Sequence, residues 1–199
     1  NKRWSTAQKD RILRSRVDGT KLLATTLAQL ERPPSVLLSA SAVGYYGDRG
    51  DDVLTETDAP GNDFLAGICT RWEEEAVHAE DFGTRVVRLR SGHVLSPRGG
   101  MLGQLVMLAK WGLNGPLGSG RQWWPWVHLE DAVGLQVHAL ESGISGAVNA
   151  VSPESVRQRE FAQTLGRVLH RPGFIPAPSL VLKLALGRFS TELLSSRRM

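Results

Sequence analysis

The sequence predicts an α/β fold built on a doubly wound parallel sheet. Two apolar runs, at the start of Val36–Gly47 and within Thr84–Ser91, have the length and composition of buried strands. Segments with helical spacing separate these runs, and this alternation is typical of a parallel sheet. Ligands of such sheets bind beyond the carboxyl ends of the strands. We therefore expect Ser39–Gly47 and Ser91–Val94 to lie side by side at one edge as a site. The alternative is an ordinary turn after each core strand.

A first helix is predicted over Thr6–Glu31. Its apolar and small residues recur at steps of three and four, which gives one buried stripe: Leu13, Val17, Thr20, Ala24 and Leu27. Gly19 interrupts this helix at a cost of about 1 kcal/mol relative to alanine, which indicates that another element approaches closely there. Pro33 and Pro34 end the helix and lead into the first strand.

The rest of the chain alternates in the same way. Asp48–Asp63 is a polar loop, and Asn62 or Asp63 is expected to cap a helix that runs to about Glu80. In that helix, Glu73–Glu75 is expected to lie away from the apolar face. Further helices are predicted over residues 101–113, 129–141 and 155–169 and after Pro178, and a further strand over residues 147–151.

Composition and charge exclude several classes of protein. The 199 residues are 41% hydrophobic and 22% charged, which is ordinary for a globular protein. The formal net charge is only +4 and the basic residues are scattered, so no nucleic-acid partner is expected. Cys69 is the single cysteine, so no disulfide forms within the chain, and the cytoplasm is the expected compartment. No apolar stretch is long enough to span a membrane. Because the chain starts with Asn1, we expect a fragment of a longer protein.

Five motifs, in order along the chain, resemble those of the extended short-chain dehydrogenases/reductases, of the epimerase/dehydratase type. The closest similarity is to the atypical subgroup named nucleoside-diphosphate-sugar epimerases. The matching segments are Val17–Leu23 (V-x-G-T-x-N-L), Ser39–Gly47 (S-S-S-x-x-V-Y-G), Leu89–Pro97 (L-R-P-G-N-V-Y-G-P), Trp126–Ala132 (F-V-H-V-D-D-V-A) and Gly146–Ala150 (G-x-x-N-V).

This resemblance implies a partial Rossmann-type sheet with a small, truncated C-terminal lobe on the substrate side. Residues 1–97 and 123–151 then form the remainder of the dinucleotide-binding domain, and residues 98–122 and 152–199 form the lobe. The family's glycine-rich phosphate-binding turn has no counterpart here. The implied cofactor is NADP, with NAD as the alternative, and the implied cofactor contacts are Ser39, Ala40, Cys69, Arg90, Ser91 and Gly92.

The family's catalytic dyad is replaced. Ser41 matches the catalytic serine, but the Y-x-x-x-K pair that transfers the proton aligns with Leu65 and Cys69. We expect these two side chains to face the site together, because a spacing of four places them on one helix face. Tyr45 and Tyr46 are alternative sources of a catalytic phenol, and the competing interpretation is that both are packing residues.

The resemblance also directs attention to a substrate side. His93 stands where the family has a residue that contacts substrate, and the alternative is a plain loop residue. Arg121 is the basic residue nearest to the expected phosphate-binding arginine. Trp124 is predicted to face a flat or apolar small-molecule substrate, although core packing is the alternative for this tryptophan-rich stretch. No metal site is expected, since His128 is interpreted as fixing a strand-to-helix turn.

Two functions remain open at this point. The first is an NAD(P)-dependent oxidoreductase or epimerase with a substituted proton donor. The second is a catalytically silent NADP-binding sensor or partner-binding module. The sequence alone does not decide whether the protein is an enzyme, and it leaves the oligomeric state unknown.

Overall fold

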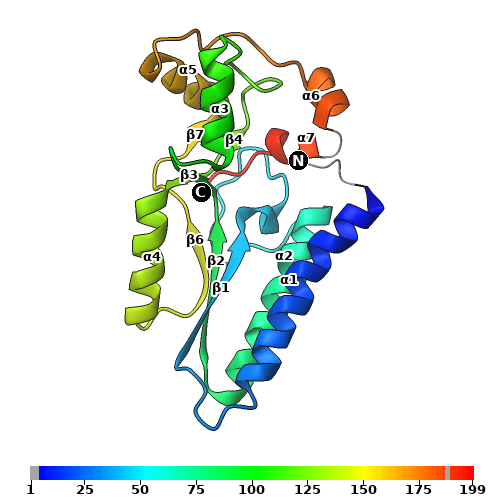
Figure 1. Cartoon of the computed structure of the whole chain (residues 1–199), viewed down its shortest axis with the longest axis vertical. Helices are drawn as coiled ribbons and strands as arrows, with labels where there is room; N and C mark the ends of the chain where they lie inside the picture. The colour runs from blue at the N-terminus through cyan, green and yellow to red at the C-terminus, as the bar shows by residue number, and fades with distance from the viewer. Residues whose placement is uncertain (1–4, 187–188) are drawn as a thin grey trace.

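A three-stranded parallel sheet forms the centre of the computed structural model, which describes residues 5–186 and 189–199. The strand order is β1 (Val36–Ala42), β2 (Arg85–Ser91) and β6 (Gly146–Ala150). In register, Ala42 lies opposite Ser91, and Ser91 lies opposite Ala150. The carboxyl ends of all three strands therefore meet at the same edge (Figure 1). The predicted α/β class with a parallel sheet is confirmed.

Helices cover both faces of this sheet (Figure 1). α1 (Thr6–Leu27) and α2 (Phe64–Val77) lie on one face, where Leu37 and Val86 pack against Ala76. α4 (Leu129–Glu141) lies on the other, where Val87 and Leu89 pack against Ala139. Successive residues of β2 thus enter different apolar clusters, which explains why its sequence is nearly continuously hydrophobic.

α1 is shorter and less buried than the sequence predicts. It ends at Leu27, and Ser5 caps its first turn by accepting a hydrogen bond from the Gln8 amide at 3.2 Å. On the predicted stripe only Ala24 is fully buried. The expectation for Gly19 is wrong: it is exposed, and nothing lies within 4 Å of the place a Cβ would occupy. Within the described residues, close packing therefore does not explain why a glycine, which lowers helix stability, occupies this position.

α2 begins where the sequence predicts. Asp63 caps it, with Oδ1 accepting a hydrogen bond from the Ala66 amide at 2.9 Å. The helix ends at Val77 and a 3-10 turn, η2 (His78–Phe82), completes the predicted span. Glu73 departs from expectation because it is buried, at 3% exposure.

Most of the remaining elements lie beyond the carboxyl ends of β1 and β2 (Figure 1). They comprise the helices α3 (Gly100–Lys110), α5 (Gln158–Val168), α6 (Ser179–Leu186) and α7 (Phe189–Leu194), with two short strand pairs. In one pair β3 (His93–Leu95) runs parallel to β5 (Trp126–His128). In the other β4 (Trp123–Trp124) runs antiparallel to β7 (Val156–Arg157). This placement is compatible with the predicted lobe, whose division from the sheet stays a prediction.

The C-terminal segment, residues 195–199, returns to the loop that follows β1. The Arg49 amide donates to the Ser196 carbonyl at 3.0 Å, and the Leu54 amide donates to the Arg198 carbonyl at 2.7 Å. The Arg197 amide donates to the Trp123 carbonyl at 3.3 Å. Separately, no helix in residues 5–186 and 189–199 has the length and hydropathy required to cross a bilayer.

Candidate functional site

The two segments predicted to form the site do meet. β1 continues into a 3-10 turn, η1 (Val43–Tyr46), and β2 is followed at once by Gly92 and His93. Gly92 is required for packing: a Cβ there would lie 2.7 Å from the Pro125 carbonyl oxygen. The His93 amide donates to that same carbonyl at 2.8 Å. The predicted contact of Gly92 with a cofactor stays a prediction beside this structural role.

Leu65 and Cys69 face the turn after β1 together, as their spacing predicts. A Cβ at Gly44 would lie 3.5 Å from Leu65 Cβ and 3.9 Å from Cys69 Sγ. Burial, with a further contribution from the Glu73 carboxylate, raises the pKa of the Cys69 thiol to about 11. The thiol is therefore neutral at physiological pH and does not replace the positive charge of the family's lysine.

Ser41 belongs to a buried polar network that the sequence did not reveal. Its hydroxyl donates to Glu73 Oε1 at 2.6 Å, and Arg90 donates to both Glu73 oxygens at 2.9 Å. Arg88 lies 3.5 Å from the same carboxylate. The signal that could have identified Glu73 is its spacing of four from Cys69, which puts it on the helix face of the dyad positions. Because its proton is committed to Glu73, Ser41 presents acceptor lone pairs only.

Tyr46 is not available as a free phenol. It is fully buried, its hydroxyl donates to Asn149 Oδ1 at 2.7 Å, and it accepts a hydrogen bond from Arg90 Nη1 at 2.9 Å. Burial raises the pKa of this phenol, although Arg90 and Asn149 oppose the shift. These contacts favour the interpretation of Tyr46 as a packing residue, and its catalytic role stays a prediction. Nothing in the sequence marked Asn149 as its partner.

Tyr45 and Arg90 form a stacked pair. The Arg90 guanidinium lies 3.4 Å from the centroid of the Tyr45 ring, a cation–π contact. Tyr45 also lines an open groove of about 530 Å³ together with Glu74 and Arg88. The Arg90 side chain donates to Glu73, to Tyr46 and to the Glu56 carbonyl. The predicted contact between Arg90 and a cofactor stays a prediction beside these bonds.

The remaining predicted cofactor contacts have small side chains. Ser39 is buried and its hydroxyl lies 3.4 Å from the Ala40 carbonyl, whereas Ala40 is exposed on β1. Ser91 is half-buried beside Ala42. The side chains that β1 itself carries from Ser39 to Ala42 are no larger than serine, and the cofactor contacts of these residues stay predictions.

His93 and Trp124 pack on each other. Their ring centroids are 4.9 Å apart, and the other neighbour of Trp124 is Phe161, at 5.4 Å. Burial lowers the pKa of His93 to about 4, so its imidazole is neutral near pH 7. Trp124 is only 1% exposed, and its indole N–H donates to the Leu193 carbonyl. Because almost none of its surface is accessible, the packing alternative for Trp124 is favoured, and its substrate contact stays a prediction.

Arg121 lies elsewhere. It is exposed and borders a surface groove of about 330 Å³ with Asp51 and Arg157. The cavities described do not bring Arg121 together with Ser41 or His93. Its contact with substrate stays a prediction. His128 has the structural role expected, since it caps α4 by accepting a hydrogen bond from the Glu130 amide.

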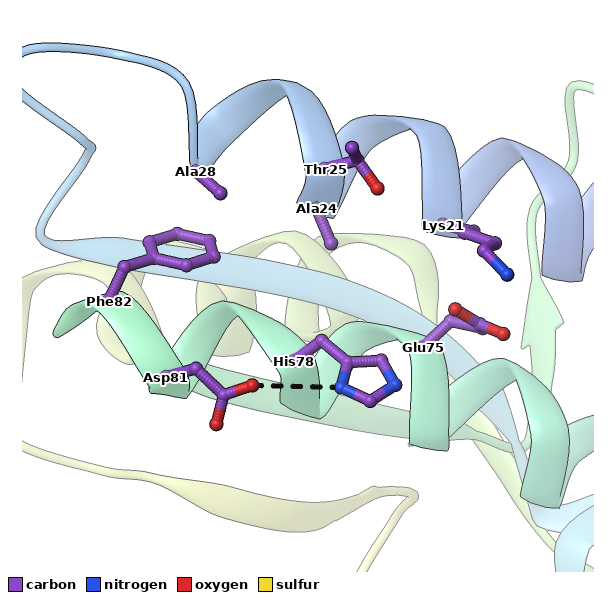
Figure 2. A pocket seen from close by; sticks show the side chains of 8 residues that line it. All are labelled: Lys21, Ala24, Thr25, Ala28, Glu75, His78, Asp81 and Phe82. Carbon is purple, nitrogen blue, oxygen red and sulfur yellow. Dashed lines mark ion pairs between the residues drawn. The ribbon is translucent and has the colours of Figure 1, made fainter.

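A groove between α1 and α2 is a separate feature (Figure 2). Its floor is formed by Ala24, Ala28 and Phe82, and His78 pairs with Asp81 at 3.7 Å on its rim. His78 follows the end of α2, whereas Leu65 stands at its beginning, and the helical rise puts the two about 20 Å apart. This groove is therefore distant from the strand ends.

A small cavity of about 240 Å³ borders Leu65 directly. α7 supplies Thr191 and Glu192 to its wall. The Glu192 carboxylate accepts two hydrogen bonds from Arg197, at 2.7 and 2.9 Å, and Arg197 Nε donates to the Gly47 carbonyl at 2.8 Å. Sequence reasoning missed Glu192, because nothing local marks α7 as reaching the turn after β1.

Comparison with known proteins agrees with this geometry. Residues 1–151 match the model of the NAD dependent epimerase/dehydratase family. The chain is 41% identical over 192 residues to the epimerase family protein Mb2239 of Mycobacterium bovis, covering 96% of this chain and 63% of the relative. It is 39% identical over 190 residues to human epimerase family protein SDR39U1, covering 94% and 64%. The chain thus spans just under two thirds of these curated relatives.

Two solved structures are similar. Human epimerase family protein SDR39U1 (isoform 2), with NADPH, superposes with a TM-score of 0.95 at 36% identity, over 99% of this chain and 68% of that one. A nucleoside-diphosphate sugar epimerase from Corynebacterium glutamicum has a TM-score of 0.73 at 35% identity, over 93% and 41%. On this evidence the chain belongs to the NAD-dependent epimerase/dehydratase family, as an atypical extended short-chain dehydrogenase/reductase.

Proposed function

We propose that this chain supplies the nicotinamide side of the site in an NADP-dependent oxidoreductase or epimerase that acts on a small molecule, with the cytoplasm as its expected compartment. The observation that carries the proposal is the meeting of two strand ends with the face of α2 that presents Leu65 and Cys69. The relative solved with NADPH has nearly the same fold over this whole chain, which favours NADP over NAD.

The residues present fit one end of such a cofactor. The side chains of β1 from Ser39 to Ala42 are small, which is compatible with the approach of a planar ring to the end of the strand. Leu65 and the neutral Cys69 offer apolar contacts beside it. When bound, a nicotinamide gives or takes a hydride. A phosphate cradle of the family's kind, a glycine-rich turn after a strand, does not occur in residues 5–186 and 189–199.

A catalytically silent NADP-binding protein is the second candidate. It is favoured by the side chains at the dyad positions, since leucine carries no proton and the Cys69 thiol stays neutral. Tyr46 is committed to Arg90 and Asn149, and Ser41 donates to Glu73. Proton transfer would thus need a group outside the family's usual set.

The test is to measure NADPH affinity and hydride transfer separately in the full-length protein. Ala40→Trp should weaken NADPH binding at least about tenfold in calorimetry, because Ala40 is exposed on β1 and is one of the predicted cofactor contacts. Ala7→Trp, at an exposed position of α1, is the matched control and should leave the affinity unchanged. Equal affinities for the two variants would contradict the proposed cofactor position. Tight binding without hydride transfer to any carbonyl compound would favour the silent candidate.

A further inference from the structure

The Glu192 carboxylate is a hydrogen-bond acceptor with capacity to spare. A carboxylate offers about four acceptor positions, and Arg197 occupies one on each oxygen. The side chain is 16% exposed and lines the 240 Å³ cavity beside Leu65. An accessible, charged acceptor held in a fixed orientation is therefore presented to whatever enters that cavity.

Apart from Thr191, whose hydroxyl is uncharged, the other polar groups of the cavity wall have contacts of their own. The Ser195 hydroxyl donates to the Thr191 carbonyl at 2.7 Å. Asp63 caps α2 through Oδ1, and its Oδ2 lies against Gly47, where a Cβ would be 3.3 Å away. The Lys9 ammonium lies 4.2 Å from the centroid of the Phe64 ring. Glu192 is thus the group best placed to receive a hydrogen bond from a ligand.

Charge and shape restrict the ligand. The guanidinium of Arg197 already compensates Glu192, and the Lys9 ammonium borders the same cavity. Asp63 lines the cavity as well, so the two carboxylates are balanced by Arg197 and Lys9, and an uncharged hydroxyl is a well matched donor. Phe64 and Leu65 supply an apolar wall. A volume of about 240 Å³ is below that of most drug-sized pockets, so the cavity suits a small alcohol or one ring of a larger molecule.

We propose that Glu192 accepts a hydrogen bond from a hydroxyl group of an alcohol bound in the Leu65 cavity. This deepens the proposed function, on which it rests: the cavity adjoins the position of the family's catalytic tyrosine, so the alcohol is the substrate or a part of it. Glu192 then determines which hydroxyl-bearing molecules are accepted, and Arg197 orients its carboxylate.

The experiment compares a probe that can donate a hydrogen bond with one of the same ring skeleton that cannot. trans-Cyclohexane-1,2-diol and its dimethyl ether are titrated into the full-length protein, and binding is followed at the Leu65 methyl resonances, because Leu65 lines the same cavity. The diol should bind about tenfold more tightly than the ether, since hydrogen bonds to charged groups are among the strongest. Equal affinities, or no binding of either probe, would overturn the proposal.

Variants locate the effect. Glu192→Gln should reduce the preference for the diol severalfold, because a neutral amide oxygen is a weaker acceptor than a carboxylate, whereas Glu74→Gln, the same change at an exposed position of α2, should keep it. If Glu192→Gln does not fold, Thr191→Phe fills the cavity from its exposed wall, and it should abolish diol binding. A preference that is undiminished in Glu192→Gln, or diol binding that persists in Thr191→Phe, contradicts the proposal. The titration needs no cofactor. Failure of NADPH to bind would therefore contradict the proposed function but would not decide whether Glu192 binds an alcohol.

Discussion

The hydroxyl of Tyr46 is held between Arg90 and Asn149, so its main contribution should be to stability. Tyr46→Phe removes an acceptor and a donor from this buried site, and we expect unfolding free energy to fall by about 1–3 kcal/mol. Tyr45→Phe is the control, because the Tyr45 phenol makes no hydrogen bond among the described residues. Denaturant titration of both variants checks this. Loss of hydride transfer in Tyr46→Phe at unchanged stability would instead support its catalytic role.

Cys69 should make stability depend on alkaline pH. Its pKa is raised from 9.0 to about 11 in the folded protein, so the unfolded chain loses the thiol proton first. The stabilisation is complete below pH 9 and disappears as pH rises to 11, by about 2–3 kcal/mol in total. Cys69→Ala should remove this pH-dependent difference in denaturant titrations at pH 8 and above. A constant difference between variant and wild type across that range would argue against the shift.

For single residues, sequence reasoning could predict roles that depend on neighbours in the sequence, and it missed roles that depend on distant residues. Asp63 was one of the two residues predicted as the cap, with Asn62, because capping involves residues three positions apart. Glu73 was placed on the polar face, because its partners Ser41 and Arg90 are 32 and 17 residues away. Glu192 was missed for the same reason, since its position relative to Leu65 is set by packing between distant segments.

At the scale of elements, α2 carries Leu65 and Cys69, the two residues that replace the family's catalytic tyrosine and lysine. The predicted spacing of Leu65 and Cys69 is confirmed by their common approach to Gly44. By contrast, the predicted length of α1 and the reason given for Gly19 were wrong, because an amphipathic pattern does not specify how much of a helix has a neighbour. Short elements such as β4 and β7 have too few residues for any periodic signal.

Restoring the dyad tests whether α2 alone limits activity. We expect Leu65→Tyr combined with Cys69→Lys to create or raise NADPH-dependent reduction of a carbonyl compound, because the pair supplies a phenol and an ammonium on the correct helix face. The ammonium introduced by Cys69→Lys would be partly compensated by Glu73, whose charge already acts on Cys69. The measurement is the rate of NADPH oxidation. The control is the double variant Leu65→Phe with Cys69→Lys, which lacks the phenol hydroxyl. Unchanged NADPH affinity without new activity would show that the site has diverged beyond these two positions.

For the whole molecule, the sheet and the elements beyond it are joined through the C-terminal segment. Ser196, Arg197 and Arg198 exchange hydrogen bonds through their main chains with the loop over residues 48–54 and with Trp123. Arg197 is 1% exposed and adds a side-chain bond to Gly47, at the turn that follows β1. The family resemblance predicted a lobe here from motif order. The hydrogen bond between Arg197 and Gly47 was not predictable, since it joins residues about 150 positions apart in sequence.

Removing the Arg197 side chain should increase the mobility of both segments that it joins, the turn after β1 and the C-terminal segment. Arg197→Met leaves the Glu192 carboxylate and the Gly47 carbonyl without their donor, and removing one member of a largely buried pair is strongly destabilising, by roughly 3 kcal/mol. We expect faster amide hydrogen exchange in residues 44–54 and 189–199, with exchange in β2 and α4 changed much less, because opening is local. Arg198→Met is the matched control, since Arg198 is exposed and its side chain contacts Trp123 only through a cation–π interaction.

Uniformly faster exchange over the sheet would show that Arg197 supports the whole fold. Faster exchange confined to residues 189–199 would show that the turn after β1 holds its position without α7, and would weaken the case for Glu192 as a fixed part of the site.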